Sequence, residues 1–173
     1  DTMRPMSELA EEVAEATVTT DGSPPQAKAV FRQDAKGPYV HDNQIKGHLR
    51  DAADALSRTV GIWGLKQLVN TALFVRPHHI HLPTGARIDT ERWPTHFDIY
   101  AHGRVSSFRE AEYVTGATLR FRLYALARSK LTPQVVEDLL NYGSGRGMGG
   151  GRGRGYGQYD FSVTRQEERV SRL

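Results

Sequence analysis

The chain has 173 residues, of which 38% are hydrophobic and 25% are charged, and it contains no cysteine. These values exclude a disulfide-stabilised scaffold and a cysteine-ligated metal, and the apolar fraction is too high for a fully disordered chain. No apolar run approaches the length of about 18 residues that a membrane-spanning helix needs. The length suits one compact domain. We expect that domain at residues 1–163, with an acidic segment at 1–25 and a charged tail at 164–173.

Basic residues are unevenly distributed along the chain. Of the 23 basic residues 18 are Arg and 5 are Lys, and the net charge is only +3. Between Arg104 and Gly157, however, there are 9 basic residues and 4 acidic ones. A local excess of this kind, rather than the net charge, points to an anionic partner.

The first strong helical signal begins at Asn43. Apolar residues from there recur at helical spacing, so we expect a helix that ends before Gly61 and has Asn43 or Asp42 as its N-cap. The elements predicted before it are a helix at residues 6–16, a strand at 27–33, a turn at 34–38 and extended residues at 39–40.

The middle of the chain predicts short elements with weaker patterns. These are, in order, a helix at residues 63–71, a strand at 73–75, its continuation at 78–82, a loop at 90–94 and a strand at 98–105.

The clearest strand pattern lies at residues 117–127, where Arg120 and Arg122 share one face. Thr132 then caps a helix that has proline at its first position. A final strand is expected at residues 158–163. This order of elements predicts an α+β fold with helices on one face of an antiparallel sheet.

A glycine-rich loop precedes the last predicted strand. Nine of the 17 glycines fall between Gly143 and Gly157. Glycine permits positive φ, and successive exposed N–H groups form concavities that bind phosphate, while arginine can pair with phosphate and tyrosine can stack on a base. The alternative is a flexible Arg-Gly linker. A nucleotide-hydrolase phosphate loop does not fit, because this loop runs into a strand. The candidate residues are Arg146, Arg152, Arg154 and Tyr156, with Gly147, Gly149, Gly150, Gly151, Gly153, Gly155 and Gly157.

A second basic feature lies at the start of the helix that follows residue 42. Lys46 and Arg50 are four residues apart, so they present two cations on one helix face. A helix N-terminus with nearby cations suits phosphate binding, although a charged face is also a common solvated surface.

The seven histidines offer two kinds of chemistry. A metal site needs three or four converging ligands, and the pair His79 and His81 on one strand face supplies two, so we predict no metal and no cofactor. Histidine also acts as a general acid or base in RNA cleavage. For that role the candidates are His48, His41 and His79.

Two segments resemble elements of one known family. Residues 39–56 resemble the Lys-Gly helix element of the RAMP superfamily, the ferredoxin-like RNA-binding proteins of CRISPR systems. The segment from Leu119 to Phe161 is similar to that superfamily's closing strand, helix, glycine loop and strand, and residues 147–157 resemble its glycine signature. The residues of the helix element that match are Lys46, Gly47, Leu49 and Arg50. The resemblance implies a ferredoxin-like (RRM-like) antiparallel sheet with the glycine loop before its last strand.

The resemblance and the basic residues together lead to a functional prediction. We expect a non-catalytic protein that binds RNA or single-stranded DNA, holding the phosphate backbone with the helix at Lys46 and Arg50 and the Gly/Arg loop, with Arg120 and Arg122 as further contacts. It would act in the cytoplasm, away from membranes, in antiviral defence or a phage, as a homo-oligomer or a subunit of a ribonucleoprotein. Two alternatives stay open: a metal-independent endoribonuclease of the CRISPR RNA-processing type, and a structural assembly protein.

Overall fold

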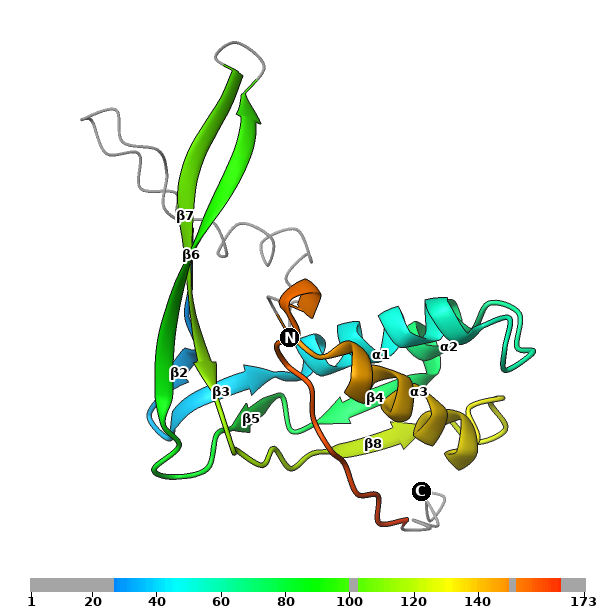
Figure 1. Cartoon of the computed structure of the whole chain (residues 1–173). Coiled ribbons are helices and arrows are strands. Elements are labelled where there is room, and N and C mark those ends of the chain that lie inside the picture. The colour runs from blue at the N-terminus through cyan, green and yellow to red at the C-terminus, as the bar shows by residue number, and fades with distance from the viewer. Residues whose placement is uncertain (1–26, 100–102, 150–151, 166–173) are drawn as a thin grey trace, which may run out of the picture. The chain divides into compact units, whose positions relative to one another are not determined.

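The computed structural model describes residues 27–99, 103–149 and 152–165 (Figure 1). The helix predicted at residues 6–16 lies outside them. An α+β fold is confirmed, since the described residues contain three α-helices and three small sheets. The described residues form two compact units, one that contains residues 27–32 and those of 84–117, and one that contains residues 33–83 and those of 118–165. In the described residues no helix is long and apolar enough to cross a bilayer.

The first unit is built on a long antiparallel ribbon. Strand β6 (Ile88–Ile99) pairs with β7 (Gly103–Val114) along its whole length, and β1 (Ala27–Ala29) lies parallel to β7 on its other side. The predicted loop at 90–94 is therefore wrong, because these residues lie inside β6. The single strand predicted at 98–105 is also wrong, because residues 98–99 end β6 and residues 103–105 begin β7, which is antiparallel to β6. Strand β6 is a sheet edge, which tolerates proline and needs no regular apolar alternation.

The second unit contains the helices and two small sheets. Its elements are β2 (Arg32–Asp34), β3 (Gly37–His41), α1 (Asp42–Leu56), α2 (Leu65–Ala72), β4 (Leu73–Arg76), β5 (His79–His81), β8 (Arg122–Ala125), α3 (Pro133–Arg146) and the 3₁₀ turn η2 (Arg152–Arg154). One sheet has the order β2-β3-β5, and the other is the antiparallel pair β4-β8. Figure 1 shows α1 and α2 above β4, with α3 alongside α1.

Helix α1 is the centre of the hydrophobic core. Its apolar positions fall at the spacing that keeps one helix face buried, and Leu49 and Ala53 are fully buried. They pack with residues such as Leu65 of α2 and Leu139 of α3, both also fully buried. Every hydrophobic side chain that the structure shows as buried belongs to this second unit.

Several predicted boundaries in this unit are wrong. The strand at 27–33 is two strands, β1 and β2, because β1 pairs with β7 whereas β2 belongs to the sheet with β3 and β5. The strand at 117–127 shrinks to the four residues of β8, because its partner β4 has only four residues. Residues 158–163 form no strand. Tyr159 there is held by side-chain hydrogen bonds instead of a ladder.

The helix termini differ from the prediction in one instance and agree in another. The N-cap of α1 is His41, whereas Asn43 and Asp42 lie inside the helix. The N-cap of α3 is Thr132, as predicted, and its hydroxyl accepts a hydrogen bond from the Val135 amide.

Candidate nucleic-acid interface

The outer face of β4 and β8 combines aromatic and basic side chains. Along β4, Leu73 and Val75 point into the core, so Phe74 and Arg76 point outward by strand alternation. Phe74 lies opposite Tyr124 in the ladder, and Arg76 lies opposite Arg122. We call Phe74, Arg76, Arg122 and Tyr124 the β4-β8 outer face.

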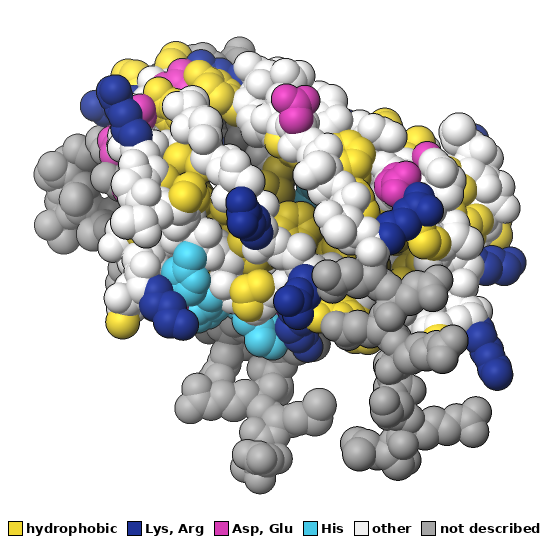
Figure 2. Space-filling model, turned by 90° about the horizontal axis from the view of Figure 1, so that it is seen from below, with side chains coloured by type: hydrophobic (Ala, Val, Ile, Leu, Met, Phe, Trp, Pro, Cys, Tyr) yellow, Lys and Arg dark blue, Asp and Glu magenta, His cyan; other side chains and the backbone are white. Residues whose placement is uncertain are grey.

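Lys46 extends this surface from α1. Its ammonium group lies 5.3 Å from the centroid of the Phe74 ring, a cation–π contact. The Phe74 residue is 37% exposed, so part of the ring remains open for stacking. A cation beside an exposed ring is the combination that holds a nucleotide, since the base stacks and the phosphate pairs. Figure 2 shows one face of the molecule on which Lys, Arg and His side chains lie among apolar ones.

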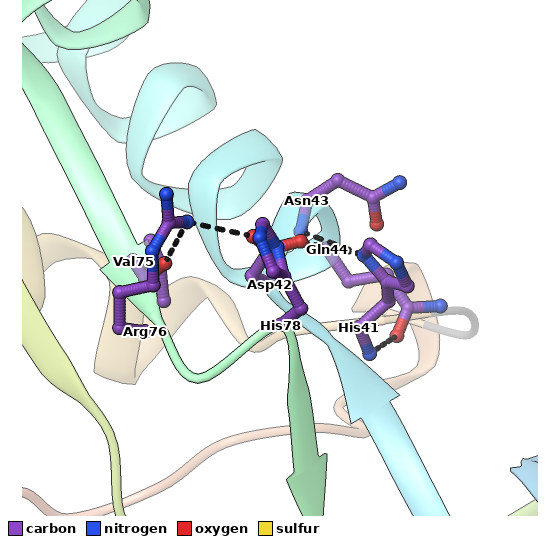
Figure 3. A network of polar contacts seen from close by, with 7 residues as sticks. All are labelled: His41, Asp42, Asn43, Gln44, Val75, Arg76 and His78. Carbon is purple, nitrogen blue, oxygen red and sulfur yellow. Dashed lines mark hydrogen bonds and ion pairs between the residues drawn. The ribbon is translucent and has the colours of Figure 1, made fainter. Parts of the chain in front are cut away.

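The start of α1 carries a network centred on the Asp42 carboxylate (Figure 3). The Nδ1 atoms of His41 and His78 lie 2.6 and 2.5 Å from its two oxygens. The Arg76 guanidinium lies 3.5 Å from the same carboxylate, and it also donates to the Val75 carbonyl. These contacts fix Arg76 on the outer face. They also put a carboxylate at the helix N-terminus, where the sequence suggested a phosphate.

Capping interactions hold His41 at the beginning of this helix. The His41 amide donates to Oε1 of Gln44 at 3.2 Å, and the His41 Nδ1 atom accepts from the Asn43 amide at 3.4 Å. The same Nδ1 cannot accept there while it donates a proton to Asp42. The shorter Asp42 contact therefore forms when Nδ1 carries a proton, and the position of the proton decides which contact is made.

A backbone hydrogen bond joins the two ends of the glycine-rich loop. The Met148 amide donates to the Gly157 carbonyl at 2.8 Å. A Cβ atom on Gly157 would lie 2.0 Å from the Met148 oxygen, and one on Gly147 would lie 2.3 Å from the Tyr156 oxygen. Both glycines have φ near +80°, at +83° for Gly147 and +78° for Gly157. Only glycine fits these two positions, which gives the loop a defined base.

The loop arginines differ in their surroundings. Arg152 forms an ion pair of 3.1 Å with Asp51 of α1, the residue that follows Arg50. Arg154 lies 5.7 Å from the Tyr156 ring. Arg146 is exposed near the end of α3. The glycine loop is therefore attached to the helix that carries Lys46 and Arg50.

A shallow groove of ≈430 Å³ lies between α1 and α3. Its lining consists of Asp51, Asp54, Ala55, Tyr142 and Arg146. Both carboxylates have cationic partners, because Asp51 pairs with Arg152 and Asp54 lies 2.9 Å from Lys66. The lining therefore carries two carboxylates, each paired with a cation outside the groove, and one cation of its own, Arg146, beside the Tyr142 ring.

A buried polar contact joins α1, α3 and the segment after the loop. His48 is 6% exposed, and its Nε2 lies 2.9 Å from the Tyr159 hydroxyl. That hydroxyl donates to the Leu140 carbonyl at 3.3 Å, so the His48 Nε2–H must donate to it. Gly143 lies against both side chains, since a Cβ there would be 2.4 Å from His48 Nε2. Burial, together with Arg152 and Arg146, lowers the pKa of His48, while Asp51 opposes this shift.

This contact predicts a pH dependence of stability. His48 is neutral when folded, and its pKa rises toward 6.5 on unfolding, so the unfolded chain binds more protons below that pH. Above pH 6.5 His48 makes its full contribution to the free energy of unfolding. This contribution is lost as the pH falls toward the lowered pKa of His48 in the folded state. Urea unfolding at pH 7.5 and 5.5 tests this in the wild type and in His48→Gln. The free energy of unfolding should fall more between pH 7.5 and pH 5.5 in the wild type than in the variant. Equal drops in both proteins would contradict the assignment.

The remaining predicted site residues are spread over the described chain. Arg50 and Arg120 are exposed. Gly150 and Gly151 lie outside the described residues, while Gly149, Gly153 and Gly155 belong to the loop and have open space where a Cβ would stand. Among the catalytic candidates, His48 is buried, His41 lies at the end of the central strand β3, and His79 lies on the edge strand β5.

Sequence reasoning missed Phe74 and Arg76. The sequence carried only a partial signal, because Leu-Phe-Val-Arg follows a helix directly and ends in an arginine, while its first three residues are all apolar. Only the pairing of β4 with β8, about 50 residues further along the chain, places Phe74 and Arg76 on one surface with Tyr124 and Arg122.

Comparisons with protein-family models and with curated proteins found no match for this chain.

Proposed function

We propose that this protein binds single-stranded nucleic acid on the β4-β8 outer face and Lys46, as a RAMP-like protein without catalytic activity. The observation that carries the proposal is Lys46 above the exposed Phe74 ring, next to the cross-strand pair of Arg76 and Arg122. Arg76 also pairs with Asp42 at 3.5 Å, so Lys46 is the cation assigned to the phosphate next to the stacked base.

In this mode of binding, the aromatic side chain stacks on a base and the basic side chains pair with phosphates. Stacking of one base on Phe74 is worth about 1–3 kcal/mol and tolerates any sequence. Each phosphate paired with a cation releases counterions and makes the affinity salt-dependent, with a slope of about −0.7 per phosphate for single strands. We therefore expect weak sequence preference and a strong response to salt.

The proximity of the two family-like segments supports the RAMP-like interpretation. Arg152 of the glycine loop pairs with Asp51 of the Lys-Gly helix, and His48 of that helix bonds to Tyr159 just after the loop. Segments separated by about 100 residues thus form one surface of the second unit. On this basis we propose a ferredoxin-like fold for the unit, and a cytoplasmic role in antiviral defence as a homo-oligomer or ribonucleoprotein subunit.

The proposal is tested by titrating the full chain into labelled single-stranded RNA and DNA and following fluorescence anisotropy. We expect binding at low salt, with log K falling linearly as log salt rises. A duplex of the same sequence should bind more weakly, because its bases are not available for stacking. Absence of binding to either single strand at low salt would overturn the proposal.

A second candidate function, RNA cleavage without a metal, is favoured by one observation. His41 and His78 flank Asp42, and their ring centroids are 6.3 Å apart, so an acid and a base are close together. Asp42 itself disfavours a phosphate between them, which ranks this candidate second. Site-specific cleavage of a hairpin RNA in EDTA, abolished by His41→Ala or His78→Ala, would establish it.

Ordered oligomers that form equally without nucleic acid would favour an assembly role instead.

A further inference from the structure

Asp34, His79 and His81 form a cluster on strands β2 and β5 that plays no part in the proposed interface. One ligating atom from each of these residues lies within 4.8 Å of the other two. The Asp34 carboxylate lies 2.9 Å from His79 Nδ1 and 2.9 Å from His81 Nε2. The two histidines share a strand face, as their spacing predicted, and the third group comes from 45 residues earlier in the chain.

The surroundings hold these three side chains in place. The Lys36 amide donates to Asp34 Oδ1 at 2.8 Å, and the Tyr39 ring stacks on His79 with centroids 3.9 Å apart. Outer contacts of this kind orient metal ligands.

We propose that Asp34, His79 and His81 form a binding site for one divalent first-row transition metal ion, with Zn²⁺ as the reference ligand. Two imidazoles and one carboxylate make a common Zn²⁺ ligand set. Tetrahedral Zn²⁺ bonds of about 2.0–2.1 Å separate neighbouring ligand atoms by about 3.3 Å. The present nitrogen–oxygen separations are 2.9–3.0 Å, so each needs to grow by only a few tenths of an ångström, and the two histidine nitrogens lie within 4.8 Å of each other.

Such a site is open to solvent on one side. The three side chains are 27–42% exposed, which gives an ion access and leaves room for water or an anion oxygen as the fourth ligand. On binding, the ion takes the place of the two imidazole protons that now face Asp34. Each imidazole then carries its proton on the other ring nitrogen. The ion would also link β2 to β5, which flank β3 in the same sheet.

The test uses the full chain without a histidine tag, freed of metal with a chelator and titrated with Zn²⁺ by calorimetry. We expect one equivalent to bind, Co²⁺ to give visible d–d absorption at the same stoichiometry, and the melting temperature to rise with Zn²⁺. The double variant His79→Ala/His81→Ala should lose all three responses. Asp34→Asn, which keeps the side-chain size, should lower the affinity by at least tenfold and serves as the test if the double variant does not fold.

The control is His78→Ala, which removes an exposed histidine that faces the other carboxylate, Asp42. It should still bind one equivalent of Zn²⁺. The proposal is overturned if the wild type shows no saturable binding at one equivalent, if the His79/His81 variant retains it, or if the control variant loses it.

Discussion

Phe74→Ala should weaken single-strand binding by about 5- to 150-fold, the loss of roughly 1–3 kcal/mol of base stacking. Folding should change little, because the Phe74 residue is 37% exposed on the outer side of β4, while its neighbours Leu73 and Val75 fill the core. The dissociation constant from anisotropy titration measures the effect. The slope of log K against log salt should stay the same, since no phosphate contact is removed.

Two further variants separate stacking from charge. Phe74→Tyr keeps a ring at the same position and should keep the wild-type affinity. Lys46→Gln keeps the side-chain length but removes the charge, so it should reduce the steepness of the salt slope by about 0.7. Wild-type affinity in Phe74→Ala would exclude this ring from the interface.

Gly143→Ala should destabilise the folded protein by about 2 kcal/mol or more. The added Cβ would lie 2.4 Å from His48 Nε2 and 2.7 Å from the Tyr159 hydroxyl, so the buried hydrogen bond between them must break or move. Overpacking costs about 1–3 kcal/mol, and an unpaired buried polar group costs a similar amount. The gain in helix propensity, about 1 kcal/mol, offsets part of this loss. Urea unfolding at pH 7.5 gives the difference.

Gly145 provides the matched control in the same helix. It lies two residues further along α3, and a Cβ there has nothing within 4 Å. Gly145→Ala should therefore stabilise the protein by about 0.4–1 kcal/mol. If both variants shifted stability in the same direction, close packing at Gly143 would not be the reason that glycine is needed there.

The helices were largely predictable from the sequence because their signals are local. Apolar spacing in α1 and the Thr132-Pro133 start of α3 depend only on neighbouring residues, and the structure has both. The N-cap was missed because histidine is an uncommon cap, and His41 fills that position through hydrogen bonds with Asn43 and Gln44. In α3, Gly143 and Gly145 lie inside the helix even though glycine is a poor helix former.

The strands and the candidate site depended on partners far away in the chain. Strand β8 is short because its partner β4 is short. Strand β6 was not predicted from the sequence because it is an edge strand without regularly spaced apolar residues. Phe74 becomes a candidate binding residue only through its neighbours Lys46 and Tyr124, which are distant in the sequence. Asp34 comes within 2.9 Å of His79 only through the pairing of β2, β3 and β5. The Lys-Gly helix and the glycine loop were visible as motifs, but their contact through Arg152 and Asp51 required the folded chain.

The most direct test of nucleic-acid binding at the β4-β8 outer face is a photo-crosslinking map. The full chain is irradiated with single-stranded RNA that contains 4-thiouridine, and the crosslinked peptides are identified by mass spectrometry. We predict crosslinks at Phe74 or Tyr124, competed away by unlabelled single strand and weakened by salt. Crosslinks confined to peptides of β6 and β7, or none above the level seen with duplex RNA, would contradict the proposed interface.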